Sequence, residues 1–336
     1  MNNNIDFIIP WVDGNDPKWQ KSFNKFAPIK DRLNVTGAER YRDWNLLRFW
    51  FRGVEKFAPW FHKIYFITCG QKPEWLNLHA ERLVWIKHED YIPKEYLPVF
   101  NVNPLELNLH KIKGLSDKFV YFNDDTFIIN HISEQRFFRD GLPCDTAICN
   151  IISPTATTNI APYMYVNNMS YINDHFNKYE QMRRNFRKWF NFKYGTAQLR
   201  SLMLLPWPNF SNLLEQHLPN AYLKSTFEEI WALYGEELLQ SSMTRFREIS
   251  NCNQWLMRDW RLIKGEFTPI DITADSYKCI LGEDKFETII KHIKLQKDKM
   301  ICINDGSLTL EQVDYMKPLL IDAFESILPE KSSFEL

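Results

Sequence analysis

Residues 5–17 read IDFIIPWVDGNDP, a short apolar run followed at once by an acidic, turn-forming stretch. An apolar run of this length that ends in turn residues is typical of a buried strand. The same pattern returns at residues 118–125, KFVYFNDD, where the run ends in Asn123, Asp124 and Asp125. We therefore expect two buried strands, each followed directly by a loop that carries a pair of carboxylates.

Strand and helix patterns alternate between these two stretches. Residues 63–69 (KIYFITC) and 83–87 (LVWIK) have strand patterns. Residues 46–57, with Asp43 as the expected N-cap, and residues 104–113 have helical patterns. Such alternation predicts an α/β fold with a mostly parallel sheet.

The two acidic loops are expected to share one edge of this sheet, because ligands of parallel sheets bind at the carboxyl ends of the strands. Asp124 and Asp125 suit a divalent cation that bridges phosphate oxygens, since Mg²⁺ prefers one or two carboxylates together with phosphates. A turn with a capping carboxylate would have the same sequence. Asp13, Gly14 and Asp16 would orient a hydroxyl, bind a ribose or share the metal, or else form an ordinary turn.

The sequence changes character after residue 150. Residues 151–170 are rich in Asn, Thr, Ser and Pro and indicate a loop, whereas residues 225–234 and 253–263 have helical patterns. Residues 301–305 (ICIND) form a strand pattern that ends in a carboxylate and could return to the main sheet. We therefore expect an α/β core, a mainly helical part, and a C-terminal strand and helix that return to the core: residues 1–150, 151–300 and 301–336.

The composition excludes several classes of protein. Of the 336 residues, 45% are apolar and 25% charged, as in globular rather than disordered or fibrous proteins. The net charge of -1 gives no overall field that attracts nucleic acid, so no nucleic-acid partner is expected. No signal peptide is visible and no segment approaches the ~20 apolar residues of a membrane span, which indicates a soluble or peripheral protein. The six scattered cysteines predict buried, reduced thiols of a cytoplasmic protein.

Basic and aromatic residues concentrate between residues 178 and 200. Seven Lys and Arg residues accompany a single acidic residue, Glu180, and Phe186, Trp189 and Phe190 lie among them. This composition suits contact with an anionic lipid headgroup or a polyanionic glycan. An exposed amphipathic helix without a partner would have the same sequence.

Single histidines and basic residues supply the remaining candidates. His217 precedes a predicted helix, and an imidazole with a pKa of about 6.5 suits general-base work, although a structural role is commoner. Arg245, Arg247, Arg258 and Lys224 either bind phosphate or form a solvated helix face. The sequence contains no P-loop, dinucleotide-binding, nucleophile-elbow or HExxH motif.

Taken in order, these segments resemble the Stealth family of sugar-phosphate transferases. WVDGNDP followed by FNDD is far more specific than either motif alone. The resemblance covers most of the chain. The matching segments are residues 5–19 for the first family region, residues 40–76, 88–93 and 109–128 for the second, residues 175–263 for the third and residues 302–306 (CINDG) for the fourth.

The resemblance implies a GT-A-like or Rossmann-like nucleotide-sugar-transferase sheet in residues 1–150 and an active-site His and Arg in residues 151–300. A UDP- or GDP-sugar would donate sugar-1-phosphate, with Mg²⁺ or Mn²⁺, to a lipid-linked or nascent capsular or cell-wall polysaccharide and leave NMP. The implied catalytic residues are His217, Asp124 and Asp125, and the two aspartates also hold the metal. The implied substrate-binding residues are Trp11, Asp13, Gly14, Asp16, Arg42, Asn123, His175, Lys224 and Arg247.

Compared with animal members of the family, the chain lacks inserted modules and membrane anchors. This implies a bacterial enzyme in the cytoplasm or on the inner face of the cytoplasmic membrane. Two other functions fit the residues themselves. An ordinary glycosyltransferase that releases NDP would use the same acidic pair, and a glycan-binding module would use aromatic platforms but leave clustered carboxylates unpaired.

Overall fold

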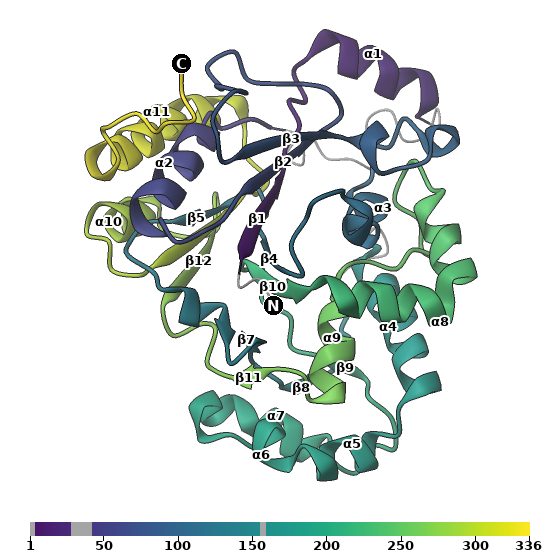
Figure 1. Cartoon of the computed structure of the whole chain (residues 1–336). Coiled ribbons are helices and arrows are strands. Elements are labelled where there is room, and N and C mark those ends of the chain that lie inside the picture. Colours follow the sequence, from purple (N-terminus) through teal and green to yellow (C-terminus); the bar gives the residue numbers. More distant parts are fainter. Residues whose placement is uncertain (1–3, 28–41, 155–158) are drawn as a thin grey trace.

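A five-stranded sheet in the order β10-β4-β1-β2-β3 lies at the centre of the molecule (Figure 1). The structure is a computed structural model that describes residues 4–27, 42–154 and 159–336. Strands β1 to β4 run parallel and β10 runs antiparallel to β4, which confirms the predicted α/β fold with a mostly parallel sheet. The strands are β1 (Ile5–Pro10), β2 (Ile64–Thr68), β3 (Leu83–Lys87), β4 (Lys118–Tyr121) and β10 (Asn220–Leu223).

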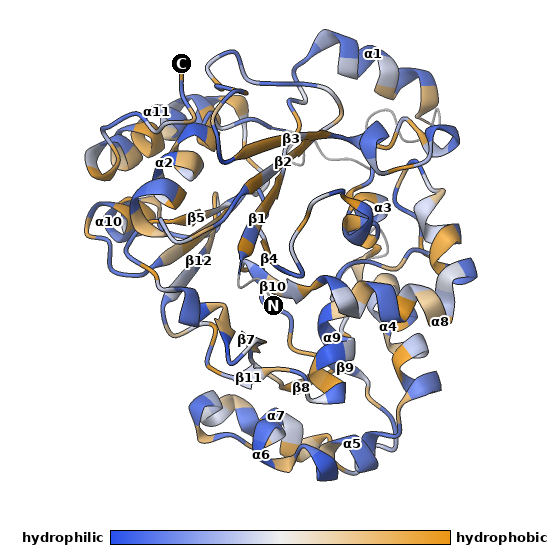
Figure 2. Ribbon diagram, in the orientation of Figure 1, coloured by the Kyte–Doolittle hydropathy of each residue, from blue (hydrophilic) through white to orange (hydrophobic). Residues whose placement is uncertain are grey.

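Strand β1 contributes side chains to the cores on both faces of this sheet. Phe7 and Ile9 pack into one apolar cluster with helix α2 (Leu47–Phe57), and Ile8 packs into a second cluster with helix α3 (Val102–Leu107). All three strand residues are fully buried, and Figure 2 shows the central strands as strongly hydrophobic. Successive side chains of a strand point to opposite faces, so one short apolar run serves both cores.

A second, three-stranded sheet follows the turn after β4. Its order is β12-β13-β5, with β5 (Thr126–Ile128), β12 (Ser276–Ile280) and β13 (Met300–Asn304). The predicted strand at residues 301–305 therefore exists, but the expectation that it could return to the main sheet is wrong. β13 pairs with β5, which already lies beyond the main sheet, and the backbone N–H of Ile303 donates to the carbonyl of Asp125 at 2.8 Å. Helices α10 (Phe286–Lys294) and α11 (Leu310–Ile327) pack against each other beside this sheet.

The part of the chain after residue 160 is rich in helices: α4 (Ala161–His175), α5 (Lys178–Arg184), α6 (Phe186–Trp189), α7 (Gln198–Met203), α8 (Lys224–Ser242) and α9 (Trp255–Lys264). The expectation of a loop at residues 151–170 is wrong from residue 161 onward, because Met164, Asn168 and Ile172 recur at helical spacing and are buried. The basic segment at residues 178–200 forms several short helices rather than one. The chain leaves helical geometry at Asn185 and at Gly195, where φ is +54°.

Two helices begin differently beside the acidic loop. In α1 (Pro17–Phe26), the Asp16 carboxylate accepts the backbone N–H of Lys18 at 2.8 Å and caps the helix. The prediction that Asp43 caps α2 is wrong. Its carboxylate instead accepts the N–H of Asn45 at 2.8 Å, and Leu46 holds the N-cap position without a side-chain bond.

A buried ion-pair network ties helix α9 to β7 (Leu142–Asp145). Asp145 accepts hydrogen bonds from Arg258 at 2.8 and 2.9 Å and from Arg261 at 2.6 Å. Arg258 is completely buried, so the structure gives it a structural role in place of phosphate binding. The remaining short strands are β6 (Phe138–Arg139), β8 (Cys149–Asn150), β9 (Asn212–Leu213) and β11 (Thr268–Pro269).

Two further expectations concern the cysteines and membrane-spanning helices. All six cysteines are free; five are buried, and Cys69 is exposed where a buried thiol was expected. Within the described ranges, no helix is both long enough and apolar enough to cross a bilayer.

Gly53 is expected to tolerate no larger residue, because α2 meets β5 at this position. A Cβ atom added to Gly53 would lie 2.4 Å from the carbonyl oxygen of Ile128. Gly53→Ala should therefore destabilise the fold by about 1–3 kcal/mol, despite the higher helix propensity of alanine. The free energy of unfolding, measured by urea denaturation, reports this effect.

Gly235→Ala in α8 is the matched control. Its added Cβ would approach nothing closer than Trp231 at 3.8 Å, so this variant should be more stable by roughly 0.5–1 kcal/mol. Equal stability of the two variants would contradict the close packing of α2 on β5.

Candidate active site

Three strands of the main sheet bring side chains to one edge. β1 and β4 are parallel and pair Ile8 with Tyr121, so their carboxyl ends lie together. β10 is antiparallel and pairs its first residue, Asn220, with Tyr121, so the segment before β10 reaches the same edge. A cavity of about 540 Å³ lies there. The predicted site residues that line it are Trp11, Arg42, Asn123, Asp124, Asp125, His217 and Arg247.

The turn that carries Asp124 and Asp125 is fixed on both sides. The backbone N–H and the hydroxyl of Thr126 donate to the carbonyl of Asn123 at 3.1 and 2.8 Å. On the other side, the N–H of Ile303 donates to the carbonyl of Asp125 at 2.8 Å. The acidic pair thus lies between the two sheets, at the strand end where the sequence pattern predicts it.

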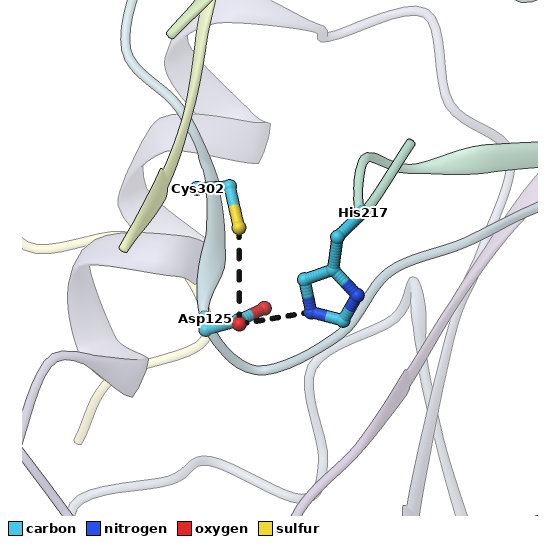
Figure 3. Close-up of side chains that lie close together, drawn as sticks. All are labelled: Asp125, His217 and Cys302. Atoms are coloured by element: carbon cyan, nitrogen blue, oxygen red, sulfur yellow. Dashed lines mark hydrogen bonds and ion pairs between the residues drawn. The ribbon is translucent and has the colours of Figure 1, made fainter. Parts of the chain in front are cut away.

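His217 contacts this turn from the segment before β10. Its Nε2 lies 2.9 Å from Oδ2 of Asp125 (Figure 3), and the Asn123 amide lies within 3.4 Å of both ring nitrogens. An ionised carboxylate only accepts hydrogen bonds, so we assign the hydrogen to Nε2, which leaves Nδ1 to accept a proton. This is the geometry of a base that a carboxylate holds in one orientation.

Burial and nearby charges shift the pKa values of Asp124 and His217. Asp124 lines the cavity and is exposed to it, and desolvation by the surrounding protein together with the charge of Asp125 raises its pKa to about 7. Burial acts to lower the pKa of His217, but the hydrogen bond and the negative charge of Asp125 outweigh burial and raise the pKa above its usual 6.5. Asp124 therefore titrates near neutral pH, where proton transfer is most useful, and the raised pKa of His217 favours its protonated form.

Asp125, His217 and Cys302 direct potential metal ligands into one small volume, with the three ligand atoms within 4.8 Å of one another (Figure 3). Cys302 is a poor ligand, because burial raises the pKa of its thiol and keeps it protonated. The carboxylates fit a cation better. Oδ1 of Asp125 is buried and finds no hydrogen-bond partner among the described residues, and Asp124 is its neighbour. Carboxylate oxygens suit Mg²⁺ and Mn²⁺, so the residues present fit the expected cation.

The first acidic loop uses its carboxylates for its own hydrogen bonds. Asp13 and Asp16 each accept the backbone N–H two residues ahead at 2.8 Å. Gln71 donates to the carboxylate of Asp16 at 3.0 Å and bonds the backbone of Asp13, and the first of these bonds lowers the pKa of Asp16. Trp11 lines the cavity, whereas Asp13, Gly14 and Asp16 are not among its lining residues. The loop therefore supports the cavity wall rather than facing into it.

Arg42 lines the cavity, and its guanidinium forms an ion pair with Asp305. Its Nη1 lies 2.7 and 2.9 Å from the two carboxylate oxygens of Asp305, and Nε1 of Trp44 donates to the same carboxylate at 3.2 Å. All three residues line the cavity. The sequence patterns do not identify Asp305 and Trp44 as site residues. The one available signal is for Asp305, which is the carboxylate at the end of the strand pattern at residues 301–305.

Two predicted substrate-binding residues lie away from the cavity. Lys224 follows β10, and its N–H donates to the carbonyl of Asp117 at 2.7 Å, at the opposite edge of the sheet. His175 ends α4 and packs on Trp260 with ring centroids 4.6 Å apart. The structure therefore does not support the expectation that Lys224 and His175 contact the substrate.

Arg247 is the cationic side chain best placed to meet a phosphate. It lines the cavity, is half-buried, and forms no hydrogen bond or salt bridge with any residue that the structure describes. Arg245, the other candidate in this segment, lies over the ring of Phe26 at 5.0 Å and is not a lining residue.

A ligand-sized cavity at the carboxyl edge of a mostly parallel sheet places this molecule among the α/β proteins that bind their ligands at that edge. Comparison with known families gives a more specific result. Stealth protein CR1, conserved region 1, matches residues 3–31, and Stealth protein CR2, conserved region 2, matches residues 40–144. The chain belongs to the Stealth family.

Curated relatives match over almost the whole chain. The capsular polysaccharide phosphotransferase WcwK of Streptococcus pneumoniae is 42% identical, with 98% of each chain covered. The exopolysaccharide phosphotransferase cps2G of Lactiplantibacillus plantarum is 38% identical, with 98% of this chain and 96% of that protein covered. Among solved structures, the galactosyltransferase LgtC matches with 8% identity and a TM-score of 0.41 over 96% of this chain and 95% of its own, a likeness too low to support an argument.

The pKa of His217 is expected to depend on Asp125. In the protein without added divalent cations, NMR titration should give a pKa above 6.5 for His217. Asp125→Asn removes the negative charge and keeps the burial, so the pKa should fall below 6.5. A proton-accepting His217 must be neutral, so wild-type activity should be lost as pH falls through the raised pKa.

His110 is the internal control for this titration, because burial and the charges of Lys111 and Lys224 lower its pKa to about 4 without a contribution from Asp125, and Asp125→Asn should leave that pKa unchanged. An unchanged pKa of His217 in the same variant would contradict the hydrogen bond between the two side chains.

Proposed function

We propose that this protein is a hexose-1-phosphate transferase that moves sugar-1-phosphate from a nucleotide sugar to a hydroxyl of a growing capsular or cell-wall polysaccharide. The observation that carries the proposal is the contact of His217 with Asp125 in a cavity that also holds Arg247. Relatives that are 38–42% identical and named polysaccharide phosphotransferases support the same reaction class. The proposed donor is a UDP- or GDP-sugar, and the proposed acceptor is a lipid-linked or nascent polysaccharide.

The acceptor hydroxyl attacks the phosphorus that bears the sugar. Nδ1 of His217 takes the hydroxyl proton, while Asp125 holds the ring and stabilises the imidazolium that forms. A new O–P bond forms and the P–O bond of the pyrophosphate breaks, so NMP leaves with the bridging oxygen. The sugar C1–O bond is never broken, and the donor's anomeric configuration is kept.

Arg247 and a bound cation would supply positive charge near the donor phosphates, where negative charge develops during the reaction. Arg247 lines the cavity and has no hydrogen-bond or ion-pair partner among the described residues, so its guanidinium is available to the leaving nucleotide phosphate. Asp124 and Asp125 would hold Mg²⁺ or Mn²⁺, which when bound neutralises charge on the donor pyrophosphate. Trp11 offers an indole surface to the donor at the end of β1.

The proposed site of action is the cytoplasm or the inner face of the cytoplasmic membrane, where a lipid-linked acceptor is presented. An ordinary glycosyltransferase would hold the same donor with the same acidic pair, but relatives named polysaccharide phosphotransferases favour sugar-phosphate transfer. The two reactions differ in the bond that breaks and therefore in the nucleotide that leaves.

The released nucleotide is expected to be UMP or GMP. Purified protein would be incubated with Mg²⁺ or Mn²⁺, a panel of UDP- and GDP-sugars and a polysaccharide primer, and the nucleotides separated by ion-exchange chromatography. The glycan should gain a phosphodiester in proportion to the NMP released, and chelation of the cation should stop both. Release of UDP or GDP instead would identify a glycosyltransferase, and no turnover of any donor would favour a binding module.

His217→Ala should lower kcat by about 10²–10⁴-fold, because it removes the group that accepts the proton. Lys224→Ala is the matched control, and its rate should stay close to that of the wild type, since Lys224 lies at the opposite edge of the sheet. Steady-state kinetics and thermal unfolding of both variants provide the comparison. A folded His217→Ala enzyme with near-full activity would remove His217 from this role.

A further inference from the structure

Helices α5 to α7 present an unusually apolar surface to solvent. Seven of the eighteen large apolar side chains that are exposed in the described ranges lie between residues 179 and 207. Phe192 is 86% exposed and Met203 75%, and Phe186, Leu199 and Trp207 are each more than half exposed. These helices lie together at the end of the view opposite α1 (Figure 1) and mix hydrophobic with hydrophilic residues (Figure 2). We call residues 179–207 the α5–α7 surface.

Basic side chains share this surface. Of the seven Lys and Arg residues at positions 178–200, two bind backbone carbonyls within the fold: Lys178 donates to the carbonyls of Leu204 and Trp207, and Lys188 to those of Gly265 and Phe267. The other five are exposed, and none forms a salt bridge with a carboxylate in the part of the chain that the structure describes. They are Arg183, Arg184, Arg187, Lys193 and Arg200.

Buried residues of the same helices hold this surface in place. Met182 and Trp189 belong to the apolar core, and Trp189 stacks on Phe210 with ring centroids 5.6 Å apart. The hydroxyl of Tyr194, also buried, donates to the carbonyl of Lys188 at 2.8 Å. The exposed side chains therefore project from a packed scaffold, and their exposure is a property of the fold.

We propose that the α5–α7 surface docks the protein on an anionic lipid bilayer. Apolar side chains such as Phe192 and Met203 would enter the boundary between headgroups and acyl chains, while the arginines meet the lipid phosphates. A nucleic acid or an acidic glycan would use the charges and the aromatic rings, but it would leave exposed aliphatic side chains such as Leu199, Leu202 and Met203 in water. The proposal rests on the proposed function in one respect, because a lipid-linked acceptor would be held at the same bilayer.

Vesicle co-sedimentation of the full chain tests this docking. The protein should bind vesicles of equimolar phosphatidylglycerol and phosphatidylcholine, should not bind pure phosphatidylcholine, and should be released by salt. Each basic residue near an anionic surface increases binding about fivefold, so Arg183→Glu/Arg187→Glu should weaken the partition coefficient by at least about 25-fold. Phe192→Ser/Met203→Ser should weaken it by about tenfold.

Matched substitutions elsewhere on the surface control for general charge and hydropathy. Lys72→Glu/Lys94→Glu reverses two exposed charges, and Leu295→Ser/Leu310→Ser removes two exposed apolar side chains. Both controls should bind the anionic vesicles as the wild type does. All four variants should keep wild-type transferase activity on a water-soluble primer, so failure of docking and failure of the proposed reaction are separate results.

Three results would overturn the proposal. Undiminished vesicle binding by Arg183→Glu/Arg187→Glu would exclude this surface. Binding to an acidic polysaccharide but not to vesicles would assign this surface to a glycan. Concentration-dependent dimers that Phe192→Ser/Met203→Ser abolishes, with no vesicle binding, would assign the apolar residues to a second copy of the chain.

Discussion

The turn at residues 123–125 belongs to two sheets at once. β4 ends before it, β5 begins after it, and β13 pairs with β5, so both sheets fix where the carboxylates lie. The carbonyl of Asp125 accepts from Ile303, and its carboxylate contacts His217. The backbone of Asp125 cannot move away from His217 without disturbing the pairing of the second sheet. This rigidity prepares the site before any ligand arrives, which is the arrangement that efficient charge stabilisation requires.

Local sequence patterns predict the four parallel strands of the main sheet and the acidic pair at its edge, because each apolar run is bounded by turn residues, but they do not predict β10. β3 has the predicted bounds, and β1 covers the apolar run at residues 5–10. The same patterns do not separate His217 from Lys224, although the two residues end at opposite edges of the sheet. That distinction depends on the antiparallel direction of β10, which its long-range pairing with β4 determines.

Other parts of the fold depend on partners that are distant in sequence. Asn168 interrupts the apolar period of α4 and makes residues 161–170 resemble a loop, yet it is buried because its amide donates to Asn253 at 2.8 Å. The sequence suggests Arg258 as a candidate phosphate ligand, but its guanidinium pairs with Asp145 inside the protein. Asp13 and Asp16 follow the predicted strand, but Gln71 and the loop backbone take up their hydrogen bonds. In each case the decisive contact is absent from the local pattern.

Because the chain is synthesised from its N-terminus, the Arg42–Asp305 ion pair forms only after most of the chain has been made. Its two residues are 263 positions apart, so at about 5–20 residues per second Asp305 leaves the ribosome roughly 15–50 s after Arg42. Until then the cavity wall lacks both β13 and the carboxylate that pairs with Arg42. A nascent chain therefore cannot carry the finished site before Asp305 has been synthesised.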